Sequence, residues 1–152
     1  MKLLEYEGKA LLSKHHVPVP AGALWPQCPP SDTGWVVKAQ VLAGGRGKRG
    51  GILMAGQRGD VEQKAALLQG AKLGDEPVHA VYIEQKLEIQ HEYYLAAFVN
   101  RDQGQVTLIA SAAGGVDIEQ VPKSDIDGVD VDPLIGLAGI HIQRLKRALA
   151  RE

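Results

Sequence analysis

Five glycines and three cations are concentrated in the eight residues 44–51. Glycine lets backbone N–H groups converge on an anion, because no Cβ blocks the approach. The interleaved Arg46, Lys48 and Arg49 add positive charge to the same short stretch. Together these groups have the chemistry that binds a polyphosphate, whereas a mobile, solvated loop is the alternative explanation of the composition. We interpret the tract as a phosphate-binding loop.

The residues around this tract decide which kind of phosphate loop it is. Residues 45–50 satisfy the pattern G-x-G-x-x-G, which in a dinucleotide-binding fold follows a strand and opens a helix. Here the apolar run 52–55 follows, and it predicts a second strand. A Lys-Ser or Lys-Thr pair, which would close a Walker loop, does not follow the glycines. We therefore predict a β-hairpin whose tip covers phosphates as a flap.

Lys38 lies inside the apolar, β-branched segment 35–42, which predicts a strand. Strand alternation places Lys38 and Gln40 on one face and the intervening apolar residues on the other. Lysine is rarely buried without a partner. A lysine beside the loop can hold phosphate, although without the loop an exposed lysine would be the simpler interpretation.

Two carboxylates lie where two predicted strands meet a linker. Glu84 ends the segment 78–84, and Glu92 begins the segment 92–100. Carboxylates accept hydrogen bonds from ribose hydroxyls, and the backbone at a strand end can pair with the edge of an adenine. Without the glycine loop, both acids would be interpreted as solvated charges.

The remaining periodicities predict a mixed α+β chain that positions these residues. Asp60 is a candidate N-cap for the second helix, residues 101–104 have turn chemistry, and residues 122–133 are acidic and loop-like. Gly114 and Gly115 mark a turn before the apolar residues of 116–119. Helices are predicted over 3–14, 61–70 and 139–152, and strands over 35–42, 52–55, 78–84, 92–100 and 105–111.

Composition excludes several classes of protein. Seventeen Lys and Arg balance eighteen Asp and Glu, for a net charge of −1, and the tract lacks interleaved aromatic residues, so nucleic acid is not the expected partner. Cys28 is the single cysteine, which excludes an intrachain disulfide and a multi-cysteine zinc site. No apolar run approaches about 20 residues, and early acids argue against a signal peptide. We expect no membrane partner and a cytoplasmic location, or the mitochondrial matrix in a eukaryote.

The order and spacing of these motifs resemble one known family. Residues 35–51, Trp-Val-Val-Lys-Ala-Gln-Val-Leu-Ala-Gly-Gly-Arg-Gly-Lys-Arg-Gly-Gly, resemble the nucleotide-binding segment of the β subunit of succinyl-CoA synthetase. That family comprises ADP-forming acyl-CoA ligases, with malate–CoA ligase and ATP-citrate lyase as relatives. Further resemblance covers nearly the whole chain: 4–12 to the family's first helix, 17–20 to its next strand, 81–96 to its hinge, and 110–119 and 132–134 to later blocks.

The resemblance implies an α+β ATP-grasp fold, in which two lobes hold ATP between them. Residues 1–19 would be a helix and strand belonging to the large lobe. Residues 20–87 would form a complete small lobe with the glycine-rich flap. Residues 88–152 would form a partial large lobe.

The resemblance also implies roles for individual residues around ATP or GTP. Lys38 would contact the phosphates, and Gly45, Arg46 and Gly47 would form the flap over them. Glu84 and Leu87 would line the adenine pocket, and Glu92 would hold the ribose. The family's magnesium ligands belong to a later block, so Mg²⁺ is expected only in the complete domain. No catalytic residue and no metal ligand are assigned within this chain.

The complete enzyme of this family would convert ATP, an acid and CoA to ADP, phosphate and an acyl-CoA, with a histidine of an α subunit accepting phosphate. The α subunit is therefore the expected partner, and the isolated chain is expected to be inactive. The expected function is the nucleotide-binding portion of such a succinate- or malate-type ligase. The alternative is a stand-alone nucleotide-sensing or protein-interaction module.

We expect the chain to be a truncated piece of a longer subunit or a shortened gene product. In either case, part of the large lobe would be left uncovered, and that surface could pair two copies of the chain. The sequence does not identify the acyl substrate, and it does not separate ATP from GTP.

Overall fold

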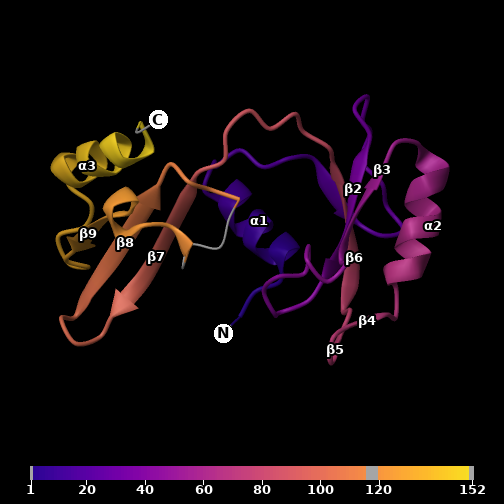
Figure 1. Ribbon diagram of the computed structural model, residues 1–152, viewed down its shortest axis with the longest axis horizontal. Coiled ribbons are helices and arrows are strands. Elements are labelled where there is room, and N and C mark those ends of the chain that lie inside the picture. The colour runs from indigo at the N-terminus through magenta and orange to yellow at the C-terminus, as the bar shows by residue number, and fades with distance from the viewer. Residues whose placement is uncertain (1, 116–119, 151–152) are drawn as a thin grey trace. The chain divides into compact units, whose positions relative to one another are not determined.

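The computed structural model describes residues 2–115 and 120–150, and it divides the chain into two compact units, Met1–Glu88 and Ile89–Glu152 (Figure 1). The N-terminal helix α1 (Glu5–Lys14) groups with the first unit. The predicted lobe ranges of 1–19, 20–87 and 88–152 stay predictions. The described helices are too short or too polar to span a bilayer.

A four-stranded antiparallel sheet forms the centre of the first unit. Its order is β1-β6-β2-β3, so the two longest strands, β2 and β6, lie in the middle. Val37 of β2 pairs with Leu53 of β3 on one side and with Ile83 of β6 on the other. The pairing of β2 with β3 confirms the predicted hairpin, with the glycine tract at its tip. The strands are β1 (Gly22–Leu24), β2 (Trp35–Gln40), β3 (Ile52–Ala55) and β6 (Ala80–Gln85).

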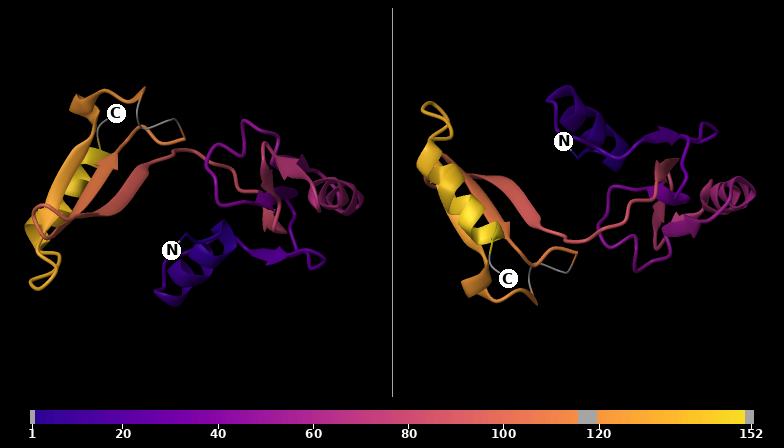
Figure 2. Two further views of the ribbon diagram at one scale, coloured as in Figure 1. Left: turned by 90° about the horizontal axis from the view of Figure 1, so that it is seen from below. Right: turned by 90° about the horizontal axis from the view of Figure 1, so that it is seen from above.

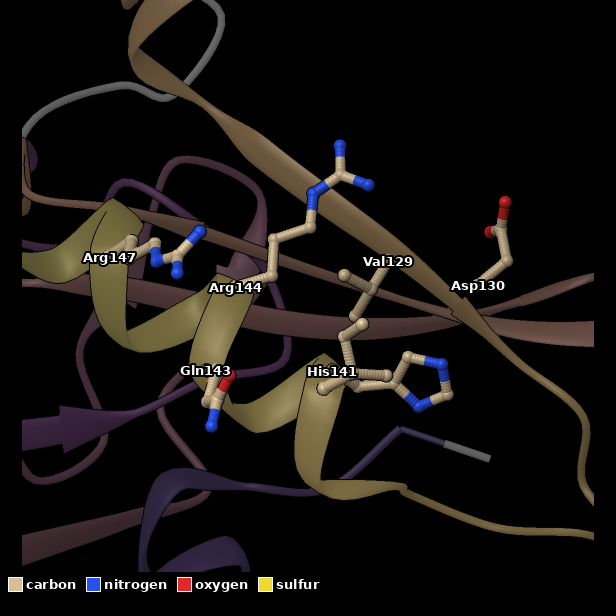
Figure 3. Close-up of a pocket in the computed structure, with 7 residues that line it drawn as sticks. Val129, Asp130, His141, Gln143, Arg144 and Arg147 are labelled. Carbon is tan, nitrogen blue, oxygen red and sulfur yellow. The ribbon is translucent and has the colours of Figure 1, made fainter.

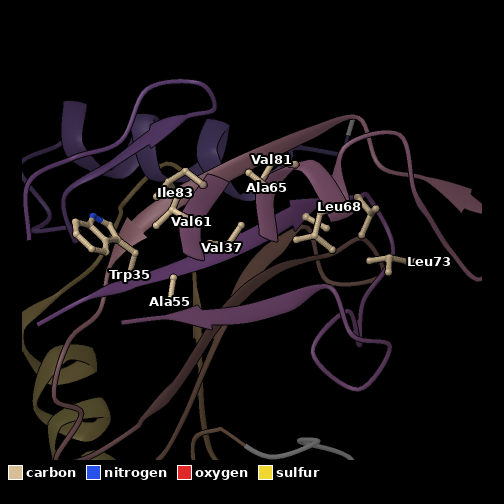
Figure 4. Close-up of a cluster of buried hydrophobic side chains, with 11 residues drawn as sticks. Trp35, Val37, Ala55, Val61, Ala65, Leu68, Leu73, Val81 and Ile83 are labelled. Atoms are coloured by element: carbon tan, nitrogen blue, oxygen red, sulfur yellow. The ribbon is translucent and has the colours of Figure 1, made fainter. Parts of the chain in front are cut away.

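Helix α2 (Arg58–Leu68) covers one face of this sheet, and a short ribbon of β4 (Lys72–Leu73) and β5 (Glu76–Pro77) leads from it to β6. The helix begins at Arg58, three residues before the predicted start, and its N-cap is Gln57 rather than Asp60. Asp60 lies in the first turn, where it accepts a hydrogen bond from the Gly56 N–H at 3.3 Å. The core between helix and sheet consists of Trp35, Val37, Ala39, Val41, Ala55, Val61, Ala65, Leu68, Leu73, Val81 and Ile83 (Figure 4).

Trp35 forms one end of this core. Its side chain packs among the buried apolar residues, and its indole N–H donates a hydrogen bond to the Pro29 carbonyl at 2.7 Å. Trp25 is half-buried and packs against the same cluster. Both tryptophans of the chain therefore report on the first unit.

Helix α1 contacts the rest of the first unit through its polar side. Glu7 accepts a hydrogen bond from the Leu4 N–H at 2.7 Å, which closes the first turn of the helix. None of the ten described helical residues is buried, and Leu11 and Leu12 are about half exposed. The predicted helix is confirmed, but the structure gives its apolar side no buried packing.

The second unit is a three-stranded antiparallel sheet covered by one helix (Figures 1 and 2). Strands β7 (Tyr94–Asn100) and β8 (Gln105–Ser111) form the predicted hairpin, closed by the turn at 101–104. Helix α3 (Gly139–Leu149) also matches its prediction and contacts β8 and β9. The core of this unit contains Ala110, Val129, Val131, Leu145 and Ala148.

The predicted acidic loop over 122–133 is wrong. Part of it forms β9 (Asp127–Val131), which pairs with β8, and a short 3-10 turn, η2 (Lys123–Asp125), precedes the strand. Val129 and Val131 point inward and Asp130 faces outward, whereas Asp127 is half-buried on the same face as the two valines. The segment 116–119 lies outside the described residues.

Candidate functional site

Five charged side chains converge on the sheet face opposite α2, and we call them the ion cluster: Glu5, Lys9, Lys38, Arg46 and Glu84. The Lys38 Nζ lies 2.5 Å from Glu84 Oε1 and 3.0 Å from Glu5 Oε1. Arg46 pairs with Glu5, and Lys9 pairs with both carboxylates. The side chain of Lys38 is 14% exposed and that of Glu84 is 6% exposed, so water screens their pair only weakly.

Strand register explains why Lys38 and Glu84 meet. Lys38 pairs with Tyr82, and Val36 pairs with Glu84, so the two charged residues are diagonal neighbours on one face. Their neighbours Val37 and Ile83 point to the other face, into the core. The predicted alternation around Lys38 is therefore confirmed, and its charged face lies under α1 rather than open to solvent.

The cluster shifts the pKa values of its members. Burial alone would raise the pKa of Glu5, but the hydrogen bond from Lys9 and the charges of Lys38 and Arg46 outweigh it and lower the pKa from 4.5 to about 2. Burial lowers the pKa of Lys38, and the negative charge of Glu5 opposes this shift. At neutral pH the Glu5 carboxylate is therefore ionised among three cations.

The glycine tract forms a turn around Arg46. Its guanidinium donates to the Ala39 carbonyl at 3.1 Å, and its own carbonyl accepts from the Gly51 N–H at 2.8 Å. A Cβ on Gly51 would lie 2.4 Å from Leu73 Cδ1 and 3.1 Å from that carbonyl oxygen, so a side chain here would force its neighbours to shift. Gly45 has a φ of +69° and open space beside it. The tract thus aims Arg46 at the cluster and leaves the backbone near Gly45 uncovered.

Two side chains hold the base of the flap. The Arg49 guanidinium donates to the Leu73 carbonyl at 2.8 Å and to the Gly44 carbonyl at 2.6 Å. The Glu76 carboxylate accepts from the N–H groups of Leu42 and Ala43, at 2.6 Å and 2.9 Å. Sequence reasoning counted Arg49 among the phosphate-binding cations, whereas here it joins the flap to the β4–β5 ribbon.

The structure brings together three of the predicted site residues, Lys38, Arg46 and Glu84, and places Gly45 and Gly47 in the flap beside them. Leu87 lies just beyond β6 and is half exposed. The predicted roles of these residues toward phosphate and adenine stay predictions.

Glu92 belongs to the second unit, where it is exposed. Its carbonyl accepts a hydrogen bond from the Gly114 N–H at 3.0 Å. A Cβ on Gly114 would collide with the Glu92 backbone, and one on Gly115 would collide with the Glu92 carboxylate. The absence of a side chain at Gly114 therefore lets the backbone approach Glu92 closely, and the predicted role of Glu92 toward ribose stays a prediction.

Sequence reasoning missed Glu5 and Lys9. Both lie within the predicted helix 3–14, and neither was assigned a site role. Their i, i+4 spacing is a recognised signal of an ion pair on one helix face, and the structure shows that pair at 2.7 Å. The further contacts to Lys38 and Arg46 join residues more than thirty positions apart, which no local spacing reveals.

Hollows lie in both units, and one in the first unit reaches the ion cluster at Lys9. In the first unit, a hollow of about 400 Å³ lies between α1 and β1, where Tyr6 stacks on Tyr82 with ring centroids 6.4 Å apart. In the second unit, a hollow of about 480 Å³ lies between α3 and β9, and Figure 3 shows Arg144 and Arg147 of α3 at its side. None of the predicted site residues, all of which the structure describes, lines either of these hollows, whereas Glu92 lines a further hollow of about 880 Å³ in the second unit, beside Tyr93 and Ser111.

The family model described as the ATP-grasp domain matches residues 2–151. The chain belongs to the ATP-grasp family. The predicted resemblance and fold are therefore confirmed.

Curated relatives of this ATP-grasp chain are succinate–CoA ligase [ADP-forming] subunits beta. The subunit from Parvibaculum lavamentivorans is 38% identical over 170 residues, which cover all of this chain and 44% of that subunit. The subunit from Polaromonas sp. is 41% identical over 155 residues, which cover 90% of this chain and 40% of that subunit. The chain thus spans less than half the length of these relatives.

Solved structures agree on the ATP-grasp fold. A dinucleotide forming acetyl-coenzyme A synthetase from Ca. Korarchaeum cryptofilum has a TM-score of 0.68 at 15% identity, over 96% of this chain and 66% of that one. ATP citrate lyase from Methanothrix soehngenii has a TM-score of 0.68 at 22% identity, over 90% of this chain and 36% of that one.

Proposed function

We propose that this chain is the nucleotide-binding part of the β subunit of an ADP-forming, succinate- or malate-type acyl-CoA ligase. We further propose that the ion cluster and the flap above it form its phosphate site. The observation that carries the proposal is the convergence of Lys38, from a buried strand, with Arg46, from a glycine-rich turn, on one shared carboxylate, Glu5. The β-subunit relatives support the assignment to this class of ligase.

The residues of this chain would act on the nucleotide by neutralising and orienting its phosphates. Lys38 offers a compact point charge, whereas the Arg46 guanidinium can bind two phosphate oxygens at once. The uncovered backbone at Gly45 lets main-chain N–H groups approach the same phosphates. Phosphoryl transfer depends on this kind of alignment and charge neutralisation. ATP or GTP is the proposed nucleotide.

Magnesium would supply further charge neutralisation when bound. Among the residues that the structure describes, no three His, Cys, Asp or Glu side chains gather into a set that would hold a metal ion. We therefore assign no step of the reaction in this chain to Mg²⁺. The proposed acceptor of the phosphoryl group is a histidine of an α subunit, and the proposal includes that the isolated chain has no ligase turnover.

Calorimetry with ADP, ATP and inorganic tripolyphosphate tests the phosphate site. We expect Lys38→Ala and Arg46→Ala each to weaken ATP binding by roughly 10-fold or more, since each removes a charge-assisted contact of about 1.5–3 kcal/mol. Lys14→Ala is the matched control, because Lys14 is an exposed cation of the same unit outside the cluster. Equal affinities of all three variants and the unmodified chain would contradict the proposed site.

Acyl-CoA formation tests the class of ligase. We expect no product from this chain alone with ATP, succinate and CoA. Turnover by the chain alone would contradict the proposal that the reaction also needs an α subunit. Tight ATP binding that is unaffected by an added α subunit would favour the alternative, a nucleotide-sensing module.

A further inference from the structure

Both cations of the proposed phosphate site are already bound to one carboxylate. Glu5 directs Oε1 to the Lys38 Nζ, at 3.0 Å, and Oε2 to the Arg46 guanidinium. One anionic group with two oxygens thus bridges a strand lysine and a flap arginine. A phosphate group would present the same chemistry to the same two cations.

The net charge of the ion cluster does not favour binding of a polyphosphate while both carboxylates stay in place. Its three cations and two carboxylates sum to one positive charge. A polyphosphate brings several negative charges, so its arrival beside Glu5 and Glu84 would place like charges at contact distance. Glu84 lies on the central strand β6 and is 6% exposed, whereas Glu5 lies in the first turn of α1 and is 20% exposed. Glu5 is therefore the carboxylate that can leave.

The packing of α1 is consistent with such a release. The helix buries none of its ten described residues, so leaving the sheet uncovers little apolar surface. Its other contacts with the sheet are polar, ionic or aromatic: the Tyr6 N–H donates to Gln40 Oε1 at 3.2 Å, Tyr6 stacks on Tyr82, and Lys9 pairs with Glu84 and lies over the Tyr82 ring. Contacts of this kind are exchanged for water or ligand more easily than a buried apolar face.

We propose that Glu5 is an internal stand-in for a nucleotide phosphate, so that α1 competes with the nucleotide for Lys38 and Arg46. Glu5 keeps the two cations paired and oriented while the site is free, and it leaves them when polyphosphate binds. This inference rests on the proposed function, because it assumes that phosphate binds these cations. It makes Glu5 a positioning residue whose removal strengthens binding of the ligand.

The test compares Glu5→Gln with the unmodified chain by calorimetry, using inorganic tripolyphosphate, ATP and adenosine as probes. Glutamine keeps the shape of the side chain but removes its charge. We expect Glu5→Gln to bind tripolyphosphate and ATP on the order of 10-fold more tightly, the effect of one charge-assisted contact. Binding of adenosine, which carries no phosphate, should not change.

Glu62→Gln is the matched control, since it removes the same charge from an exposed position on α2 of the same unit. It should leave all three affinities unchanged. Thermal unfolding of both variants checks that the unit remains folded. If Glu5→Gln does not fold, Glu5→Asp serves instead, because its shorter side chain keeps the charge but loosens the bridge, and tripolyphosphate binding should again tighten.

The outcomes separate this inference from the proposed function. If the unmodified chain binds tripolyphosphate and the folded Glu5 variant binds it equally or more weakly, the competition is refuted while the phosphate site stands. If neither chain binds tripolyphosphate or ATP, the proposed function fails and the inference fails with it. Equal strengthening for adenosine would also refute the competition.

Discussion

At the scale of single residues, the decisive feature is that five charges share one partly buried face. Lys38 would be unfavourable there alone, because burial disfavours its charged form. Glu84 and Glu5 compensate it, and Arg46 and Lys9 compensate the carboxylates in turn. Removing one member of the cluster therefore leaves another charge without its partner. An unpaired, partly buried charge lowers the stability of the fold.

The low pKa of Glu5 predicts a stability change at acid pH. The folded-state pKa of about 2 lies below the ordinary value of 4.5, so ionised Glu5 stabilises the fold above pH 4.5. That contribution, at most about 3 kcal/mol, is lost as pH falls from 4.5 toward 2. Urea unfolding should show a gap in free energy between the unmodified chain and Glu5→Gln at pH 7 that shrinks by pH 2.5. A gap independent of pH would contradict the assignment.

At the scale of elements, the flap is a hairpin tip attached to a neighbouring ribbon. Arg49 joins it to β4 and Glu76 of β5 caps two of its N–H groups. The position of Arg46 therefore depends on the β4–β5 ribbon, which holds the base of the flap. Through Arg46, the ribbon also affects the pair of cations that Arg46 and Lys38 form in the proposed site.

Glu76→Ala is predicted to loosen the flap. It removes the acceptor of both the Leu42 and the Ala43 N–H groups, and the loss of one such charge-assisted hydrogen bond, about 1.5 kcal/mol, would already raise the open population roughly 10-fold. Trypsin should then cut more rapidly after the cations at 46–49, as mass spectrometry of the fragments can follow. Asp75→Ala is the control, because Asp75 is an exposed neighbour in the same turn. The same cleavage rate in both variants would show that Glu76 does not hold the flap.

The elements that the sequence predicts well have a clear local pattern. The hairpin around the glycine tract, the hairpin around 101–104 and helix α3 each combine periodicity with turn residues or a clear apolar face. Strand β9 was missed because Asp127 and Asp130 obscured the alternation of Val129 and Val131. The site was predicted in part: Lys38 and Arg46 stand out by type, whereas Glu5 becomes visible only when α1 folds onto the sheet.

At the scale of the whole molecule, the residues that the structure describes form two separate hydrophobic cores. The first lies between α2 and the four-stranded sheet, and the second lies between α3 and the three-stranded sheet. The ion cluster and flap belong entirely to the first unit, whereas Glu92 belongs to the second.

Separate cores predict separate responses to a core mutation. Ile83 is fully buried on the central strand β6, so Ile83→Ala should destabilise the first unit by about 2–5 kcal/mol. Hydrogen exchange measured by mass spectrometry should rise across 1–88 and stay unchanged across 89–152. Leu67→Ala is the control, because Leu67 is 68% exposed on α2. An equal rise in both units would show that they unfold as one.

The placement of the two indole rings gives this chain a built-in optical probe. Trp25 and Trp35 are the only tryptophans in the sequence, and both pack against the core of the first unit. Intrinsic tryptophan emission therefore follows that unit alone, while far-ultraviolet circular dichroism follows both. Because Trp35 sits on the same strand as Lys38, its emission can also be monitored during a nucleotide titration without attaching a dye.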